Sequence, residues 1–193
     1  MIGIIDYGAG NTKSVMNALD RINSSYFLSN DLDKLQSAEK LILPGVGHAK
    51  SAMKQLESLD LVDFIREWKR PFLGVCLGMQ LLADYTEEGE TKCLGILDEK
   101  ILKFQQDELK IPKMGWNTTF PSNDVLFNSI KEDDYFYFVH SYYLPVSAHS
   151  IADADYGLKY TAAVRKDNYW GVQFHPEKSA KAGSIILQNF DKI

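Results

Sequence analysis

A cysteine with one glycine two residues before it and another two residues after it constrains this chain more than any other feature. The three residues are Gly74, Cys76 and Gly78. The apolar run at residues 72–75 predicts a buried strand, and from Leu77 onward apolar residues recur with helical spacing. A strand that becomes a helix at a nucleophile, between small residues that let backbone approach closely, is a nucleophile elbow, here with a thiol. The helix start also favours negative charge on the sulfur. The alternative is a buried, inert cysteine, and the flanking glycines favour the nucleophile.

Length and composition predict one ordinary globular domain over residues 1–193. The chain is 45% hydrophobic and 24% charged, and its formal net charge of −5 gives no reason to expect nucleic acid as a partner. No apolar run is long enough to span a bilayer, and the first residues do not resemble a secretory signal, so we expect a cytoplasmic protein with no membrane partner. A disulfide between Cys76 and Cys93 would consume the elbow thiol, so both are expected to be reduced.

Strands and helices alternate through the first half of the chain, which predicts an α/β fold. The expected strands there are residues 2–5, 26–28, 41–43 and 72–75. Thr12 and Asp60 are expected to cap two of the helices, and residues 31–36 form a third, short one. This alternation predicts a mostly parallel sheet covered on both faces, a flavodoxin-like three-layer sandwich.

The second half of the chain is richer in strands and is expected to add an antiparallel region to the sheet. The expected strands are residues 100–104, 113–117, 135–140, 160–164 and 170–174. We expect a loop at residues 85–95, a short helix at 125–130 and a last helix at 184–190.

The carboxyl ends of the predicted parallel strands would bring Asp6, Gly45 and Cys76 to one edge of the sheet, where sites of such folds lie. The loop that continues through Val46 and Gly47 contains two glycines. Its peptide planes can turn and present N–H groups, which an oxyanion site requires.

Two glycines after the first strand, Gly8 and Gly10, raise the alternative of a nucleotide site. Lys13 stands where the dinucleotide fingerprint has its third glycine, and the Gly-Lys-Ser/Thr of a phosphate loop is absent. A tight turn between strand and helix is therefore favoured.

A cysteine nucleophile needs a base, and His175 has the best context for one. It follows an apolar strand, and Glu177 stands two residues later, on the same side of an extended chain. Pro176 disfavours helix at the histidine. Glu177 could therefore accept a hydrogen bond from one ring nitrogen and leave the other for Cys76. The remaining histidines are His48, His140 and His149, and no spacing among the four predicts a metal site.

Taken together, these residues resemble the class I glutamine amidotransferases, whose glutaminase domains use Cys, His and Glu. The two motifs that match are Gly74-Val75-Cys76-Leu77-Gly78-Met79-Gln80 and His175-Pro176-Glu177. Within that family the chain is similar to the glutaminase subunits of imidazole glycerol phosphate synthases. That narrower likeness rests on residues 6–11, 43–47, 114–117, 138–142 and 173–179, in the same order over the whole chain.

The resemblance implies a mechanism in which Cys76 attacks the side-chain amide of glutamine, His175 transfers protons and Glu177 holds His175. It implies an oxyanion site formed by the N–H of Leu77 and the segment of Val46 and Gly47, and it implies no cofactor. Glutamine-binding residues implied in the same way are Gln80, Glu88, Ser141 and Tyr142.

The resemblance also implies a partner, a (β/α)₈-barrel cyclase subunit that receives the ammonia in a heterodimer. That complex makes imidazole glycerol phosphate and an aminoimidazole carboxamide ribotide in histidine biosynthesis. Residues that match partner-facing positions of the family are Asn11, Trp116, Tyr137 and Lys178.

Two positions depart from the family pattern and leave the partner open. Lys113 stands where the family commonly has His, and His48 follows the glycine loop where a small residue is usual. Paralogous glutaminases that supply ammonia for amidination of surface-polysaccharide sugars share the triad motifs. A non-catalytic, flavodoxin-like nucleotide-binding module and a cysteine hydrolase of another substrate, such as a peptide, are the alternatives from other classes.

Overall fold

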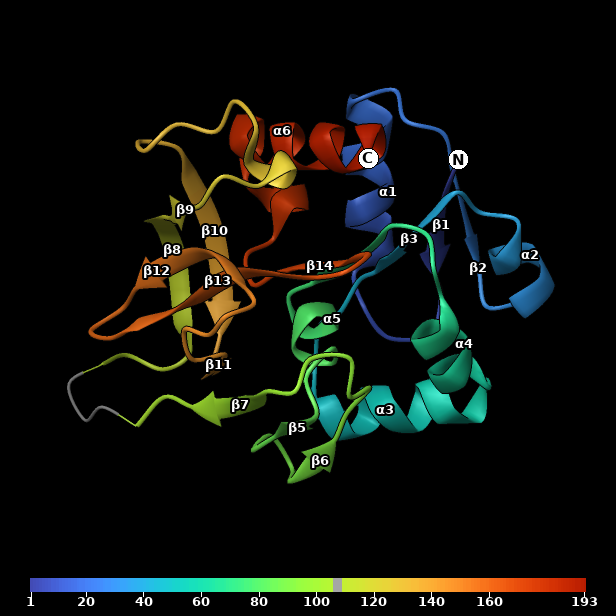
Figure 1. The fold of residues 1–193 in the computed structure, drawn as a ribbon, viewed down its shortest axis with the longest axis horizontal. Coiled ribbons are helices and arrows are strands. Elements are labelled where there is room, and N and C mark those ends of the chain that lie inside the picture. Colours follow the sequence, from blue (N-terminus) through green and yellow to red (C-terminus); the bar gives the residue numbers. More distant parts are fainter. Residues whose placement is uncertain (106–108) are drawn as a thin grey trace.

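The computed structural model describes residues 1–105 and 109–193, and its centre is one eight-stranded sheet (Figure 1). Five strands run parallel, in the order β2 (Tyr26–Ser29), β1 (Ile2–Ile5), β3 (Lys40–Leu43), β4 (Phe72–Val75) and β14 (Tyr169–Val172). The sheet continues antiparallel through β13 (Lys159–Lys166), β12 (Ser150–Asp155) and β9 (Phe120–Pro121). The prediction of a mostly parallel α/β sheet with an antiparallel addition is confirmed.

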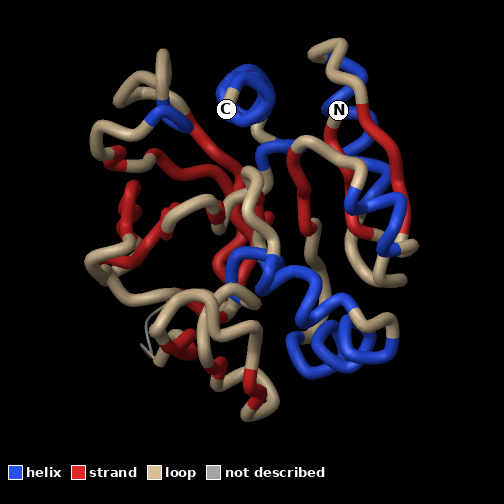
Figure 2. The backbone as a smooth tube through the Cα atoms, turned by 45° about the vertical axis from the view of Figure 1, so that its right-hand side comes forward, coloured by secondary structure: helices blue, strands red, loops and turns tan. Residues whose placement is uncertain are grey.

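Helices cover both faces of this sheet and make three layers (Figures 1 and 2). On one face α1 (Thr12–Arg21) and α6 (Ala180–Lys192) bury Leu19 and Ile186 in one core cluster with Ile4. On the other face α3 (Ala49–Ser58) and α4 (Leu61–Glu67) bury Leu56 and Ile65 in a second cluster, which also includes part of α2 (Leu32–Gln36). Within the described residues, no helix combines the length and apolar character needed to cross a membrane.

Two smaller sheets and three short helical turns complete the part of the chain that the structure describes. β8 (Lys113–Thr118) and β10 (Tyr135–His140) form an antiparallel ribbon. The other sheet has the order β11 (Tyr142–Tyr143), β7 (Lys100–Lys103), β5 (Tyr85–Thr86) and β6 (Thr91–Lys92). The turns are α5 (Leu77–Gln80) and the 3₁₀ helices η1 (Val125–Phe127) and η2 (Pro176–Lys178).

Several local predictions were wrong in detail. Residues 85–95 were expected to be a loop, but the Gly89 turn closes a small hairpin of β5 and β6. Asn11, not Thr12, caps α1, because its side-chain oxygen accepts the Ser14 N–H. Asp60 precedes α4 with φ of 55° and makes no side-chain cap. The helix α3 and the strand β12 were not predicted.

The elbow depends on backbone segments that come too close for any side chain. A Cβ on Gly78 would overlap the carbonyl oxygen of Leu43 in β3. A Cβ on Gly74 would lie 2.5 Å from the Gly78 oxygen, and one on Gly45 would lie 2.5 Å from the Gly78 nitrogen. Backbone atoms cannot move aside as a flexible side chain can, so the turn after β4 packs directly on the end of β3.

We therefore expect Gly78→Ala to destabilise the fold by about 3 kcal/mol or more, because overpacking against backbone forces the sheet edge to shift. Urea unfolding followed by circular dichroism measures the change. Ser51→Ala, on the exposed side of α3, is the matched control and should change stability by less than about 0.5 kcal/mol. Equal stability of Gly78→Ala and wild type would contradict this account of the elbow.

Candidate active site

The elbow cysteine is held in a backbone conformation that residues other than glycine seldom adopt. Cys76 has φ of 54° and ψ of −108°, and it directly follows β4. Its N–H donates to the Val172 carbonyl of the neighbouring strand at 2.8 Å. The residue is only 7% exposed. A strained position of this kind, over-determined by its surroundings, is typical of a functional residue.

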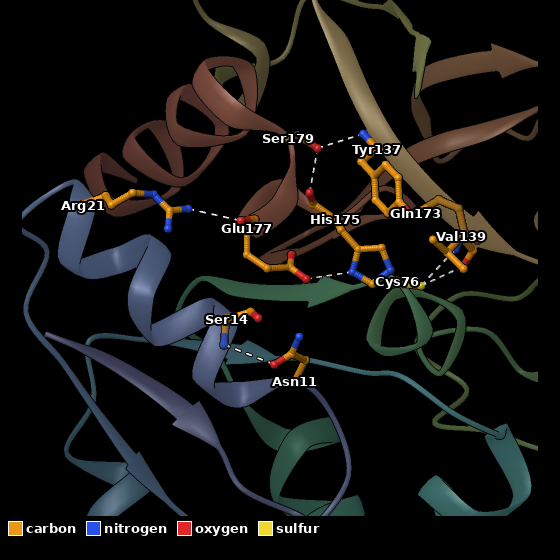
Figure 3. A network of polar contacts seen from close by, with 10 residues as sticks. All are labelled: Asn11, Ser14, Arg21, Cys76, Tyr137, Val139, Gln173, His175, Glu177 and Ser179. Atoms are coloured by element: carbon orange, nitrogen blue, oxygen red, sulfur yellow. Dashed lines mark hydrogen bonds and ion pairs between the residues drawn. The ribbon is translucent and has the colours of Figure 1, made fainter. Parts of the chain in front are cut away.

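His175 and Glu177 come from the strand next to the elbow strand. β14 pairs with β4 in parallel, with Val172 opposite Val75, so the residues that follow the two strands emerge side by side. His175 Nδ1 lies 2.8 Å from Glu177 Oε1. A carboxylate only accepts, so Nδ1 carries the hydrogen and the other ring nitrogen is left facing Cys76 (Figure 3). The predicted geometry of the three residues is thus present.

Two neighbours of His175, Cys76 and Glu177, change its pKa. Burial alone lowers the pKa of this imidazole, but hydrogen bonds to Cys76 and Glu177, and the charges of both, raise it above its usual 6.5. The side chains of His175 and Glu177 are 4% and 2% exposed, so solvent screens the pair little. The pair therefore holds a proton on the histidine at neutral pH, ready for donation.

The backbone of the histidine is fixed by β10. His175 N–H donates to the Tyr137 carbonyl at 2.8 Å, and the Ser179 hydroxyl donates to the His175 carbonyl at 2.6 Å. The same hydroxyl accepts the Tyr137 N–H at 2.9 Å, and Arg21 donates to the Glu177 carbonyl at 3.1 Å (Figure 3). These contacts hold the backbone of His175 and Glu177 in place.

A cavity of about 260 Å³ opens beside the sulfur. This volume lies just below the usual range of small-molecule sites, roughly 300–1,000 Å³, and suits an amino acid better than a nucleotide. The predicted site residues that line it are Val46, Gly47, Cys76, Leu77, Gln80, Glu88, Ser141, Tyr142, His175 and Lys178. The unpredicted ones are Pro112, Val139 and His140.

Two of the residues expected to bind glutamine already have partners in the protein. Gln80 is buried, and its amide nitrogen donates to the Tyr142 carbonyl at 3.0 Å. One carboxylate oxygen of Glu88 accepts the Ala49 N–H at 2.7 Å, at the start of α3. A ligand in the cavity would therefore meet the remaining oxygen of each side chain.

Three of the four predicted partner-facing residues contact one another. The rings of Trp116 and Tyr137 lie 5.7 Å apart, and the Lys178 ammonium lies 5.9 Å from the Tyr137 ring. The outer face of the β8–β10 ribbon is apolar, with Met114 65% and Trp116 52% exposed. Asn11 lies apart from them, at the start of α1 below Glu177 (Figure 3).

Lys113 was placed near the partner side by its position in the sequence, but the structure buries it. Its ammonium donates to the Tyr160 hydroxyl at 2.6 Å and lies 4.3 Å from the Phe138 ring centre. Burial lowers its pKa to about 8. His48, the other departure, is exposed at the start of α3, where its ring accepts the Lys50 N–H.

Sequence reasoning also missed Gln173, whose side chain contacts Cys76. Its side-chain nitrogen lies 3.7 Å from Cys76 Sγ, and the Val139 carbonyl oxygen lies at the same distance from the sulfur. Within the described residues, no group of three or more His, Cys, Asp and Glu side chains is arranged to hold a metal ion.

Comparisons with known proteins agree with this geometry. The model of the family "Glutamine amidotransferase class-I" matches residues 3–193. A Vibrio parahaemolyticus protein named imidazole glycerol phosphate synthase subunit HisH is 46% identical, over 97% of this chain and 95% of its own length. A Campylobacter jejuni protein named imidazole glycerol phosphate synthase subunit HisH 2 is 47% identical, over 98% and 96%.

Solved structures support the fold independently. The crystal structure of a putative GMP synthase component from Thermoplasma acidophilum superposes with a TM-score of 0.75 at 19% identity, covering 99% of this chain and 92% of its own. At that identity the likeness concerns the α/β fold alone.

The titration of His175 tests the arrangement directly. We expect its ring signals in NMR to titrate well above pH 6.5 in the wild type, and at lower pH in Cys76→Ala and in Glu177→Gln, since each variant removes a partner that raises the pKa. The contribution of this raised pKa to stability is complete below pH 6.5 and is lost as the pH rises through the folded-state value.

His140 is the internal control for that experiment. Burial lowers its pKa to about 3, so His140 should stay neutral and show no protonation of its own ring between pH 5 and 9. A His175 that titrates at the same pH in all three proteins would contradict the assigned contacts.

Proposed function

Because this chain belongs to the class I glutamine amidotransferase family, we propose that Cys76, His175 and Glu177 are a catalytic triad that releases ammonia from glutamine. The observation that carries the proposal is the position of the His175 ring. One ring nitrogen is hydrogen-bonded to Glu177, and the other faces Cys76. The elbow supplies the nucleophile and the cavity beside it is of amino-acid size.

In the first step the Cys76 sulfur attacks the side-chain carbonyl carbon of glutamine, and the carbonyl electrons move onto oxygen. The N–H of Leu77, the first residue of α5, has no partner inside the helix and can meet this oxyanion. A second N–H would come from the Val46–Gly47 segment, which lines the same cavity. Gly47, with φ of 102° and open space around it, allows that peptide to turn.

In the second step His175 gives its proton to the departing nitrogen, the carbon–nitrogen bond breaks, and ammonia leaves a thioester on Cys76. The now neutral imidazole takes a proton from water, whose oxygen attacks the thioester. Glutamate leaves and the sulfur is restored. Glu177 keeps the hydrogen on Nδ1 throughout, so that the nitrogen facing the sulfur is the one that transfers protons.

The cavity also offers groups for the other end of glutamine. The free carboxylate oxygen of Glu88 and the side-chain oxygen of Gln80 can accept from the α-ammonium, and the backbone of Ser141 and Tyr142 lines the same wall. None of these steps uses a cofactor.

The chain is the glutaminase subunit of an imidazole glycerol phosphate synthase, the complex for which its relatives at 44–47% identity are named. Its ammonia would pass to a cyclase subunit in a cytoplasmic heterodimer. We propose a (β/α)₈-barrel for that partner and a docking face that includes Asn11, Trp116, Tyr137 and Lys178. The cyclase would release imidazole glycerol phosphate and an aminoimidazole carboxamide ribotide in histidine biosynthesis.

Glutamate release from glutamine, with and without the cyclase and its ribotide ligand, tests this function. We expect strong stimulation by the cyclase, loss of activity in Cys76→Ala, and a fall of about 10²–10⁴-fold in His175→Asn, which removes the general acid and base. Cys93→Ala is the matched control and should keep the activity, because Cys93 is buried away from the cavity.

The other outcomes favour the other hypotheses. Hydrolysis that the cyclase does not stimulate would favour a partner that amidinates surface-polysaccharide sugars. Turnover of a peptide substrate without a partner would favour a different cysteine hydrolase. Binding of a mononucleotide with no glutamine turnover under any condition would favour the non-catalytic module.

The docking face makes a separate prediction. Trp116→Ala should weaken cyclase binding by about 2 kcal/mol, near thirtyfold, because a half-exposed aromatic at the centre of an apolar face is typical of an interface hot spot. Titration calorimetry measures the affinity. Val146→Ala, 47% exposed and outside that face, should bind as the wild type does. Equal binding of both variants would exclude Trp116 from the interface.

A further inference from the structure

Behind the nucleophile lies a buried chain of three hydrogen bonds that no step above uses. The Gln80 side-chain nitrogen donates to the Tyr142 carbonyl at 3.0 Å and to Gln173 Oε1 at 2.8 Å. Gln173 Nε2 in turn donates to Cys76 Sγ at 3.7 Å, within hydrogen-bond range for sulfur (Figure 3). Gln173 is fully buried and Gln80 is 5% exposed, so water competes little for these groups.

The direction of each of these hydrogen bonds follows from the one between Gln80 and the Tyr142 carbonyl. A backbone carbonyl can only accept, so the Gln80 atom facing Tyr142 must be the amide nitrogen. The second hydrogen of that nitrogen points at Gln173, whose facing atom must then be the oxygen. The nitrogen of Gln173 is thereby turned toward the sulfur, and it can only donate.

The sulfur also has a neighbour of the opposite kind, a hydrogen-bond acceptor. The Val139 carbonyl oxygen lies 3.7 Å from Sγ, and a carbonyl can bond a protonated thiol but repels a thiolate. Cys76 therefore lies between one group that favours the thiol and one that favours the thiolate. Hydrogen bonding to the charged form of a group favours that form.

We propose that Gln173 is a positioning residue for the reaction, one that holds Cys76 Sγ as the attacking thiolate through a donated side-chain N–H. Gln80 and the Tyr142 carbonyl keep this amide in the donating orientation. The inference rests on the proposed role of Cys76 as nucleophile and adds a residue whose contact is with the sulfur rather than with glutamine. It also gives the Gln80 amide nitrogen a task separate from substrate binding.

Other charged or titratable groups near the sulfur stay unchanged in the test below. His175 is in hydrogen-bond contact with Cys76. Tyr7 is buried close by. Its pKa is raised mainly by burial and to a smaller extent by the charge of Cys76. Glu88 and Lys178 line the same cavity.

The experiment measures alkylation of Cys76 by iodoacetamide as a function of pH, in a Cys93→Ala background so that one thiol reacts. Gln173→Met keeps the length of the side chain and removes the donor, and Gln173→Glu replaces the donor with a charged acceptor. We expect the midpoint of the pH profile to rise in both, more in the glutamate variant, with alkylation at pH 7 slowed about tenfold or more. In glutamate release with the cyclase, kcat should fall while KM changes less than about twofold.

Val172→Ala is the matched control, because it removes buried volume from the preceding residue of β14 and leaves the sulfur contacts in place. It should lower the unfolding temperature without moving the alkylation midpoint. A folded Gln173→Met with the wild-type midpoint would overturn the proposal. If that variant does not fold, Gln80→Met decides: it frees the Gln173 amide to rotate and should raise the midpoint by a smaller amount, and an unchanged midpoint there overturns the proposal too.

The two proposals fail differently. Absence of glutamine hydrolysis by the wild-type complex would reject the glutaminase function. The alkylation profile would still report whether Gln173 holds the sulfur, because iodoacetamide needs neither glutamine nor the cyclase.

Discussion

The close backbone contact between the elbow and the end of β3 is the constraint on which the site depends. There is no room for a Cβ at Gly78, beside the Leu43 carbonyl. There is also none at Gly45, beside the Gly78 nitrogen. Three backbone segments therefore meet without side chains between them. This contact holds Cys76 in its strained conformation at the end of β4. It also places the loop that begins at Gly45 directly against the first turn of α5. The same packing contact thus fixes both the proposed nucleophile and the proposed oxyanion donors.

β10 connects the site to the surface. Its backbone holds His175 through the Tyr137 carbonyl and Ser179 through the Tyr137 N–H. The Tyr137 ring contacts Trp116 on the exposed face of the ribbon. A partner bound to that face would therefore touch the same residue whose main chain positions His175, the proposed base. The partner-facing surface proposed for this chain and the proposed base thus meet in one residue, Tyr137.

The sequence predicted those parts of the site whose residues lie close together along the chain, and it missed those that depend on contacts between distant segments. The elbow and the His175 motif are short, and glycine spacing or period-two spacing describes each of them. The contact of Gln173 with Cys76 is not local, because it requires that β14 lie next to β4, and no pattern in either strand states its neighbour. The location of Lys113 was predicted wrongly for another reason. Strand alternation turns Lys113 inward and Met114 outward, whereas lysine usually lies at the surface and methionine in the core. In the interior, the ring faces of Phe138 and Tyr160 stabilise the buried Lys113 ammonium.

The buried Lys113 also bears on the polar chain behind the nucleophile. His140 is its cross-strand partner, and burial, together with the charges of Lys113 and His175, keeps that imidazole neutral. A neutral ring has one N–H, and here it lies on Nδ1, because that atom faces the Tyr142 carbonyl at 2.8 Å. The same carbonyl accepts from Gln80, so two donors converge on it and neither can reverse. The Lys113 ammonium thus favours the neutral form of His140, whose single N–H lies on the Tyr142 carbonyl. The direction of the hydrogen bonds that end at the sulfur is fixed by the Tyr142 carbonyl itself, which can only accept.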